Sequence, residues 1–230
     1  MDDIEIQQLD NLESIHFWYK ARKLQLSRWF LQFKHPLRVL DLGSATGGNS
    51  LHLSAMGHHV TSAEYSHIGV AIQRSKGISV IQADARSLPF PECSFDLVVC
   101  LDVLEHIVED HVAAREIFRV LKPGGKFLVS VPEDPLLWSA HDVAVNHVRR
   151  YSKEMLVELM SGSGLSCRNT WSTLVYLRPI IILARKFSNS SSLKKMNPLI
   201  NYILWQICRV ELLIGRNHRK GVTIWMDGVK

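Results

Sequence analysis

The sequence predicts an α/β protein with a doubly wound, mostly parallel sheet, and three observations support this class. Strand-like apolar runs alternate with helix-like segments from residue 38 to residue 131, as in successive βαβ units. The runs RVLDL (38–42) and FDLVVCL (95–101) are apolar almost throughout, which is typical of strands covered on both faces. The chain of 230 residues is 47% hydrophobic and 21% charged, so it can build an ordinary globular core.

Composition also excludes several classes of protein. The four cysteines form no CxxC pair, which disfavours a zinc ribbon or a disulfide framework and favours a reducing compartment. The start, MDDIEIQQLD, is acidic and lacks the apolar stretch of a secretory signal. No apolar run reaches the roughly 20 residues that a membrane span requires. We therefore expect a cytoplasmic protein.

The chain begins with a predicted helical cap over residues 1–35. Apolar residues such as Trp18, Trp29 and Phe30 recur at helical spacing and indicate one or two amphipathic helices. The cap ends at His35-Pro36, because the residue before a proline avoids the helical conformation.

The remaining elements follow from periodicity and from glycine and proline positions. We expect strands at 38–42, 59–63, 78–83, 95–101 and 126–131, with helices from 48 to 56, at 68–75 and at 110–121. LKPGG at 121–125 ends the last of these helices. Beyond residue 150 we expect a helix at 152–160, a strand at 165–173, two apolar segments at 174–187 and 198–214, and a last strand at 221–226.

Positive charge is concentrated in the C-terminal quarter. Residues 1–170 contain 17 Lys and Arg against 20 Asp and Glu, whereas residues 171–230 contain 10 Lys and Arg against only Glu211 and Asp227. The net charge of +5 therefore arises from the excess of basic residues in the C-terminal quarter, and this excess needs an explanation of its own.

The loop after the first strand has the composition of a nucleotide-binding turn. In VLDLGSATGG (39–48) a strand leads into small residues that begin a helix. Gly43 and Gly47 let the backbone approach a ligand, and N–H groups at the start of the helix attract anions. The loop alone is a weak signal, since a tight turn without a ligand looks the same.

Two acidic residues at strand ends strengthen this interpretation. Glu64 lies 21 residues after Gly43, close to the offset of about 20 residues for an acid that binds ribose. Asp84 follows the third expected strand, where it can accept a hydrogen bond from the adenine amino group or cap a helix. The segment Asp102–His106 follows the fourth strand and should face the same crevice.

Together with QADARSLPFPECSFDLVVCLDVLEHI and LKPGGKFLVSVPE, these motifs resemble the class I S-adenosylmethionine-dependent methyltransferases. The likeness is greatest to the type 11 group related to ubiquinone-biosynthesis O-methyltransferases. It implies a seven-stranded Rossmann-like core over 36–173, a helical insertion at 174–220, and a last core strand within 221–230. Ala45 stands where the family often has a glycine.

The resemblance also implies S-adenosylmethionine as the cofactor and assigns roles to eight residues. The methionine part of the cofactor would be lined by Asp41, Gly43, Ser44 and Gly47. The ribose would be held by Glu64, the adenine would meet Asp84 and Ala85, and Leu101 would flank the sulfonium.

A sulfonium methyl group is already activated, so the protein must mainly align the acceptor and exclude water. We expect methylation on oxygen of a small-molecule or a lipid- or glycan-linked acceptor, with a histidine as general base. The candidates are His147 and His141, and after them His106. Each of them is equally well explained as a hydrogen-bonded loop histidine.

Other charged residues near these histidines have alternative interpretations. Asp102, Glu105 and His106 match the magnesium ligands of some quinone O-methyltransferases, but we expect no metal and a pocket-shaping role instead. Arg149 and Arg150 either bind an anionic group of the acceptor or pair with Glu154 and Glu158.

The basic, apolar segment 174–220 has three interpretations. It forms a lid over the substrate pocket, a homodimer face, or a surface that lies on the inner membrane face with Tyr202 and Trp205 at headgroup depth. Nucleic acid is disfavoured as a partner, because the basic residues are interleaved with long apolar stretches.

Two rival functions remain at this stage. A nicotinamide-dependent oxidoreductase could share the spacing Gly43-x-Ala45-x-x-Gly48 followed by Glu64, although the DVLEH and LKPGG motifs argue against it. A non-catalytic module could keep the cofactor pocket without turnover.

Overall fold

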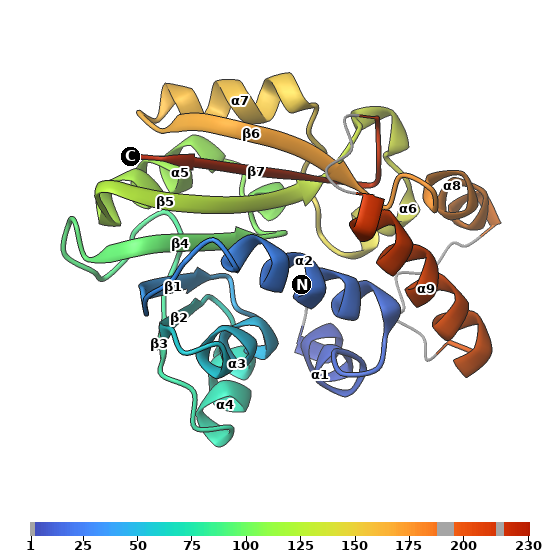
Figure 1. Cartoon of the computed structure of the whole chain (residues 1–230), viewed down its shortest axis with the longest axis horizontal. Helices are drawn as coiled ribbons and strands as arrows, with labels where there is room; N and C mark the ends of the chain where they lie inside the picture. The colour runs from blue at the N-terminus through green and yellow to red at the C-terminus, as the bar shows by residue number, and fades with distance from the viewer. Residues whose placement is uncertain (1–2, 188–195, 215–218) are drawn as a thin grey trace.

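The computed structural model describes residues 3–187, 196–214 and 219–230. Its centre is a seven-stranded sheet in the order β3-β2-β1-β4-β5-β7-β6 (Figure 1). The strands are β1 (Arg38–Leu42), β2 (His59–Glu64), β3 (Val80–Gln82), β4 (Phe95–Leu101), β5 (Leu121–Pro132), β6 (Ser166–Thr173) and β7 (Thr223–Val229). Only β7 runs antiparallel to its neighbours β5 and β6. The prediction of a doubly wound, mostly parallel, seven-stranded sheet is confirmed.

Helices precede, connect and follow the strands. They are α1 (Asp3–Leu12), α2 (Phe17–Phe30), α3 (Gly48–Ala55), α4 (His67–Ser75), α5 (Asp110–Val120), α6 (Ala140–Ala144), α7 (Lys153–Gly162), α8 (Arg178–Phe187) and α9 (Pro198–Ile214), with short 3₁₀ turns η1 (Leu104–His106) and η2 (Pro135–Leu137). None of these helices is long and apolar enough to cross a membrane, as judged over the described residues.

The near-continuous apolar strands fill two cores at once. In β4, Leu97 and Val99 pack with Leu26 and Trp29 of α2 on one face of the sheet. The intervening residues of β4 pack with Ile117 of α5 on the other face. Because side chains alternate along a strand, a strand covered on both sides must be apolar at every position.

The strand ends that carry the predicted site meet at one edge of the sheet. Leu42 at the end of β1 pairs with Ala63 of β2 and with Cys100 of β4. The end of β5 also reaches this edge, because Pro132 pairs with Thr223. The carboxyl ends of the parallel strands and the loops after them therefore share one rim.

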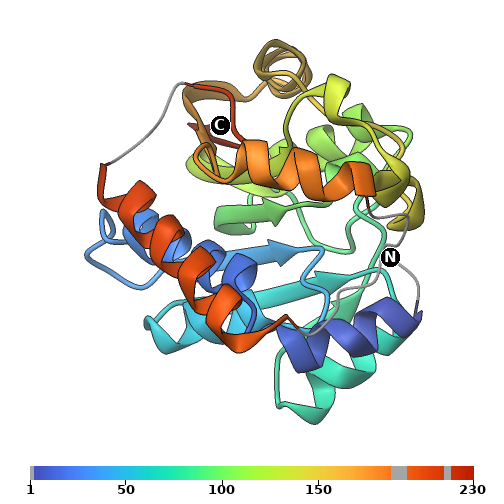
Figure 2. The same ribbon diagram turned by 90° about the vertical axis from the view of Figure 1, so that its right-hand side faces the viewer.

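The C-terminal insertion leaves and returns at the same rim. Thr173 ends β6 and pairs with Thr223, which begins β7. The described residues between them, including α8 and α9, therefore lie at the end of the molecule toward which the parallel strands point. Figure 2 shows α1, α8 and α9 grouped at this end.

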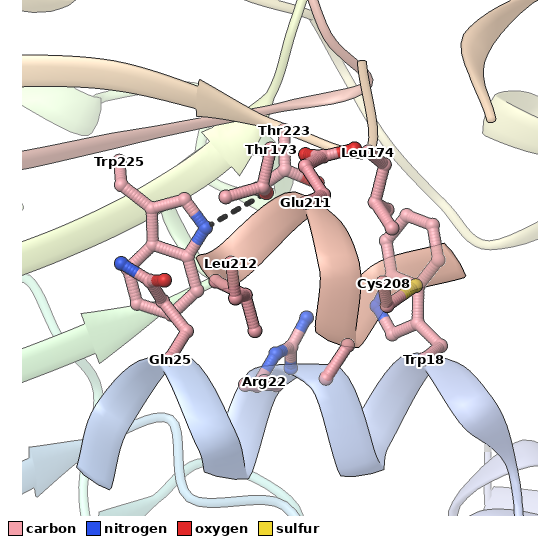
Figure 3. Close-up of a pocket in the computed structure, with 11 residues that line it drawn as sticks. Trp18, Arg22, Gln25, Thr173, Leu174, Cys208, Glu211, Leu212, Thr223 and Trp225 are labelled. Carbon is pink, nitrogen blue, oxygen red and sulfur yellow. Dashed lines mark hydrogen bonds between the residues drawn. The ribbon is translucent and has the colours of Figure 1, made fainter. Parts of the chain in front are cut away.

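The inner side of α9 packs on α2. Trp18 and Arg22 of α2 point toward α9, the helix of Cys208, whereas Gln25 lies beside Trp225 of β7 (Figure 3). These residues line a small cavity of about 30 Å³. The buried Glu211 accepts a hydrogen bond from the backbone N–H of Tyr176 at 3.2 Å. This contact ties α9 to the segment that follows β6.

The structure corrects several expected boundaries. The third strand covers only Val80–Gln82, and the fifth begins at Leu121 instead of residue 126, because Leu121 pairs with Phe95. The last strand is Thr223–Val229, and α6 was not expected. The predicted cap and insertion are both helical, whereas the division at 1–35, 36–173, 174–220 and 221–230 stays a prediction.

Candidate active site

A cavity of about 700 Å³ opens at the rim where the parallel strands end. Its walls come from the loops after β1, β2, β3 and β4, from α1 and α2, and from α8 of the insertion. Nine predicted site residues line it: Gly43, Ser44, Glu64, Asp84, Ala85, Leu101, His106, His141 and His147. The topology thus gathers in one cavity residues that lie up to 104 positions apart in the sequence.

The loop after β1 needs glycine at its first position. Gly43 has φ +71°, and its N–H donates to the carbonyl of Ala63 at 2.8 Å. A Cβ at Gly43 would lie 2.3 Å from Cγ2 of Val103. The loop can therefore pass between β2 and the β4 loop only where no side chain intervenes.

Two predicted cofactor residues, Asp41 and Gly47, are not among the residues that line the cavity. Asp41 is buried, and Ser50 Oγ donates a hydrogen bond to it; burial raises the pKa of Asp41 to about 7. Gly47, at φ +83°, precedes α3 and leaves room for Ile78 and Gln73. Both residues support the loop from outside the cavity, and their direct contact with a cofactor stays a prediction.

Glu64 presents a buried carboxylate to the cavity. Its Oε2 accepts from the N–H of Ala45 at 2.7 Å, and its Oε1 accepts from the N–H of Ser66 at 2.8 Å. Burial raises its pKa. These two hydrogen bonds fix the carboxylate in one orientation and leave lone pairs that can accept hydrogen bonds from the ribose hydroxyl groups.

Asp84 lies at the end of β3 and is paired with Arg86. The guanidinium donates to both carboxylate oxygens, with the shorter bond at 2.7 Å, and these hydrogen bonds lower the pKa of Asp84. No helix begins here, so the capping role does not apply. The buried Ala85 lies beside it in the cavity wall.

The β4 loop brings a different set of ligands together from the one that the sequence suggested. Asp102 pairs with Arg22 of α2 and accepts from Ser130 Oγ. Among the described residues, one group able to hold a metal ion is Glu105, His106 and His147, whose ligand atoms lie within 4.8 Å of one another. Asp102 is not part of this group, and the assignment of no metal stays a prediction.

His147 is oriented by a buried acid. Its Nδ1 lies 2.9 Å from Oδ1 of Asp142, and Asp142 also accepts from Arg150 Nε at 2.8 Å. If Nδ1 carries the proton, Nε2 has its lone pair free on the side of Glu105, whose Oε1 is 3.8 Å away. A neutral imidazole held in this way is a competent general base.

Glu105 is the most unusual acid in the cavity. It is fully buried, and neither carboxyl oxygen has a hydrogen-bond partner within the described part of the chain. Burial and the neighbouring Asp102 raise its pKa well above the ordinary value. Its surroundings therefore favour the protonated carboxyl group, which can donate a hydrogen bond into the cavity.

The other two candidate bases have weaker arguments from geometry. The ring of His106 contacts that of His147 at 4.8 Å between centroids. Burial, and then the neighbouring His147, lower the pKa of His106 to about 4, which makes it a poor proton acceptor near neutrality. His141 lines the cavity at the start of α6. All three roles stay predictions, with His147 the best supported.

The two arginines of the HVRRY motif are engaged by other residues than those expected. Arg150 binds Asp142 and the carbonyl of Glu133, while Arg149 binds Asp110 at 2.6 Å. Neither pairs with Glu154 or Glu158 in these contacts. These contacts anchor the segment between α6 and α7.

Sequence reasoning missed the contribution of the N-terminal helices. Glu13 lines the cavity and accepts from Thr46 Oγ1 at 2.8 Å. His16, Tyr19 and Arg22 also line it. The amphipathic pattern of this region indicated a helix, but it carried no signal for the surface against which the helix packs.

Taken together, the rim, the glycine loop and the acids after β2 and β3 define a doubly wound α/β protein with a nucleoside-binding site. A family profile described as "Methyltransferase domain" matches residues 40–129. The chain is similar to a demethylmenaquinone methyltransferase of Clavibacter sepedonicus, at 36% identity over 134 residues, which are 55% of this chain and 53% of the relative. It is also similar to a ubiquinone/menaquinone biosynthesis C-methyltransferase of a Shewanella species, at 30% identity over 56% of this chain and 55% of the relative.

Solved structures extend the likeness to the whole fold. A methyltransferase from Thermotoga maritima, described as a possible histamine N-methyltransferase, superposes with a TM-score of 0.66 at 17% identity and covers 99% of this chain and 97% of its own. The profile match and these relatives support the assignment of the chain to the class I S-adenosylmethionine-dependent methyltransferases, and the solved structure shares its fold. The chain spans about half the length of the first curated relatives that it matches.

S-adenosylmethionine is accordingly the cofactor, and the residues present fit it. The fixed, buried carboxylate of Glu64 suits a pair of ribose hydroxyls. Leu101 and Ala85 contribute apolar surface to the wall of the same cavity. This family assignment displaces the nicotinamide-dependent oxidoreductase as an interpretation of the glycine loop.

Proposed function

We propose that this protein transfers a methyl group to an oxygen of a small-molecule or a lipid- or glycan-linked acceptor whose reactive end is apolar. The cofactor supplies an electrophilic methyl group. The observation that carries the proposal is the His147–Asp142 pair at 2.9 Å in a cavity whose other walls include Phe17, Trp18 and Ile181.

The chain's own residues divide the work. Asp142 keeps the proton on Nδ1 of His147, so that Nε2 can take the proton of an acceptor hydroxyl. Arg150 holds Asp142 in place. In its protonated form Glu105 can offer a hydrogen bond to an acceptor oxygen, and the apolar walls exclude water, which strengthens both interactions.

Carbon methylation is the second candidate, and it is supported by the Shewanella relative, which is described as a C-methyltransferase. Methylation of a phenol ring carbon also requires proton removal, so the same base serves both reactions. The two outcomes differ in the product: an O-methyl ether has lost the acidic hydroxyl, whereas a C-methyl phenol keeps it.

His147→Gln tests the proposal. We expect turnover to fall by a factor on the order of 10²–10⁴, the usual contribution of a general base, with little change in affinity for S-adenosylhomocysteine by calorimetry. Methyl transfer from labelled S-adenosylmethionine to fractionated cell extract, with mass spectrometry of the product, provides the readout.

His111→Gln, on the surface of α5, is the matched control and should retain wild-type turnover. Full activity of His147→Gln would remove the base assignment. Tight cofactor binding by the wild type, with no methylated product in any fraction, would favour the non-catalytic module instead.

A further inference from the structure

Helix α9 is apolar on both sides, and only one side is covered. Its inner residues Leu204 and Cys208 belong to a cluster with Phe17 of α2. On the opposite side Leu199 and Leu213 are 67% and 77% exposed. A helix that is hydrophobic all round is normally enclosed on all sides, so the outer side of α9 lacks a partner within the described chain.

Helix α8 has the same property. Leu177, directly before it, is buried in the same cluster, and Ile181 lines the large cavity. Ile180 and Leu183 are more than half exposed. We call the exposed apolar residues of the two helices the outer surface: Ile180, Leu183, Leu199, Ile200, Tyr202, Ile203, Val210, Leu213 and Ile214.

Charge indicates what covers the outer surface. Residues 174–220 contain nine Lys and Arg and one acid, Glu211. That acid is buried and bound to the backbone of Tyr176. Asp134, outside the segment, pairs with Arg178 at 2.6 Å, and the segment keeps a large excess of positive charge after both acids are counted. Exposed apolar residues in a basic segment are typical of an interfacial membrane segment, whereas two copies of so basic a segment would repel each other.

We propose that the outer surface of α8 and α9 binds an anionic phospholipid surface. The apolar side chains enter the boundary between headgroups and acyl chains, and exposed basic residues beside them, such as Arg209 of α9, meet the lipid phosphates. The helices lie in the interface and do not span it, in agreement with their length. Trp205 packs inward with the cluster, so Tyr202, at 59% exposure, takes the headgroup position alone.

The position of this surface has a consequence for the acceptor. Ile181 of α8 and Trp18 of α2 line the cavity, and both also belong to the cluster beneath the outer surface. A bound membrane is therefore next to the acceptor end of the cavity. Entry of a lipid-linked acceptor from the bilayer rests on the proposed function, whereas lipid binding itself does not.

Flotation of the full chain with vesicles tests the proposal. We expect the protein to float with vesicles of mixed phosphatidylglycerol and phosphatidylcholine, and not with phosphatidylcholine alone. Raising the salt toward 1 M, where the Debye length is about 3 Å, should release most of the bound protein. Absence of flotation with anionic vesicles at low salt, or equal flotation with both vesicle types, would overturn the proposal.

Substitutions locate the contact. Ile203→Glu combined with Leu213→Glu places charge on exposed positions of α9, and we expect vesicle binding to fall at least tenfold. Ile180→Glu combined with Leu183→Glu gives the same test on α8. Leu31→Glu is the matched control, because Leu31 is 77% exposed but lies at the far end of α2 from this surface. Undiminished flotation of both double variants would contradict the proposal.

Two further measurements separate the alternatives. Light scattering of the wild type should show a monomer in the absence of lipid, and a dimer that the α9 variant dissociates would identify the surface as a self-interface instead. S-adenosylhomocysteine binding by calorimetry should be unchanged in all variants. If the wild type did not bind S-adenosylhomocysteine, this would count against the proposed function, but it would not affect the conclusion about lipid binding.

Discussion

At the scale of single residues, Gly43 shows how one missing side chain makes room for the cofactor loop. Its φ of +71° and the 2.3 Å approach of a hypothetical Cβ to Val103 are independent constraints. Gly57, in the turn after α3, has φ +92° and open space around its Cβ position. A side chain at Gly57 would therefore cause backbone strain alone, whereas a side chain at Gly43 would cause both backbone strain and a steric clash.

We predict that Gly57→Ala loses about 1 kcal/mol of stability from backbone strain alone. Gly43→Ala should lose about 1–3 kcal/mol more, because Val103 must move, and its affinity for S-adenosylhomocysteine should fall at least tenfold. Urea unfolding and calorimetry measure the two effects. Wild-type affinity in Gly43→Ala would mean that the loop does not contact the cofactor.

His106 makes stability depend on pH in a defined direction. Folding lowers its pKa from 6.5 to about 4, so in this interval the unfolded chain binds a proton that the folded chain does not. His106 therefore does not affect the free energy of unfolding above pH 6.5. As the pH falls from 6.5 toward 4 it destabilises the folded protein by an increasing amount, which reaches at most about 3 kcal/mol.

His106→Asn should remove this dependence. We expect the stability of the wild type relative to the variant to be lower at pH 4.5 than at pH 7.5, as measured by urea unfolding. A stability difference that is the same at both pH values would show that His106 does not titrate as described.

The predicted site residues that lie in the cavity are those whose position follows from topology. Glu64 and Asp84 directly follow strands, and strand ends share a rim in any doubly wound sheet. Arg22 lies in α2, and Glu13 lies in the turn between α1 and α2. The docking of these helices depends on side-chain packing, and the spacing of the two residues carries no information about the cavity. Tertiary structure was needed to place them.

At the scale of elements, α1 covers the cavity. Ile6 and Leu9 are buried and line it, and Asp10 pairs with Lys76 after α4. Leu9→Ser should weaken S-adenosylhomocysteine binding several-fold, because water gains access to the cavity. Gln8→Ser, on the exposed side of the same helix, is the matched control. Equal affinities of the two variants in calorimetry would show that α1 has no part in binding.

Element types were more predictable than their limits. The helix after residue 110 ends at Val120 as LKPGG implied, but Leu121 joins a strand because it pairs with Phe95 across the sheet. Helix α6 has only five residues and depends on a capping box between Ser139 and Asp142. Periodicity is not informative over so short a segment.

At the scale of the whole molecule, β7 holds the sheet together. It lies between β5 and β6, and its Asp227 accepts a hydrogen bond from Trp29 of α2 at 2.8 Å. Removal of residues 221–230 leaves β6 without a neighbour and opens one edge of β5, so we predict a chain without cooperative thermal unfolding. Removal of residues 1–10 should leave cooperative unfolding intact and weaken only cofactor binding. Circular dichroism distinguishes the two truncations.

The place of β7 in the sheet also affects how the polypeptide is made. During translation at roughly 5–20 residues per second, the stretch between Thr173 and Thr223 takes on the order of 3–10 s to emerge. Until then the edge of β5 is open, and such an edge readily recruits strands from other nascent chains. Chaperone supply during expression should therefore limit the yield of this protein more than the stability of its finished form does.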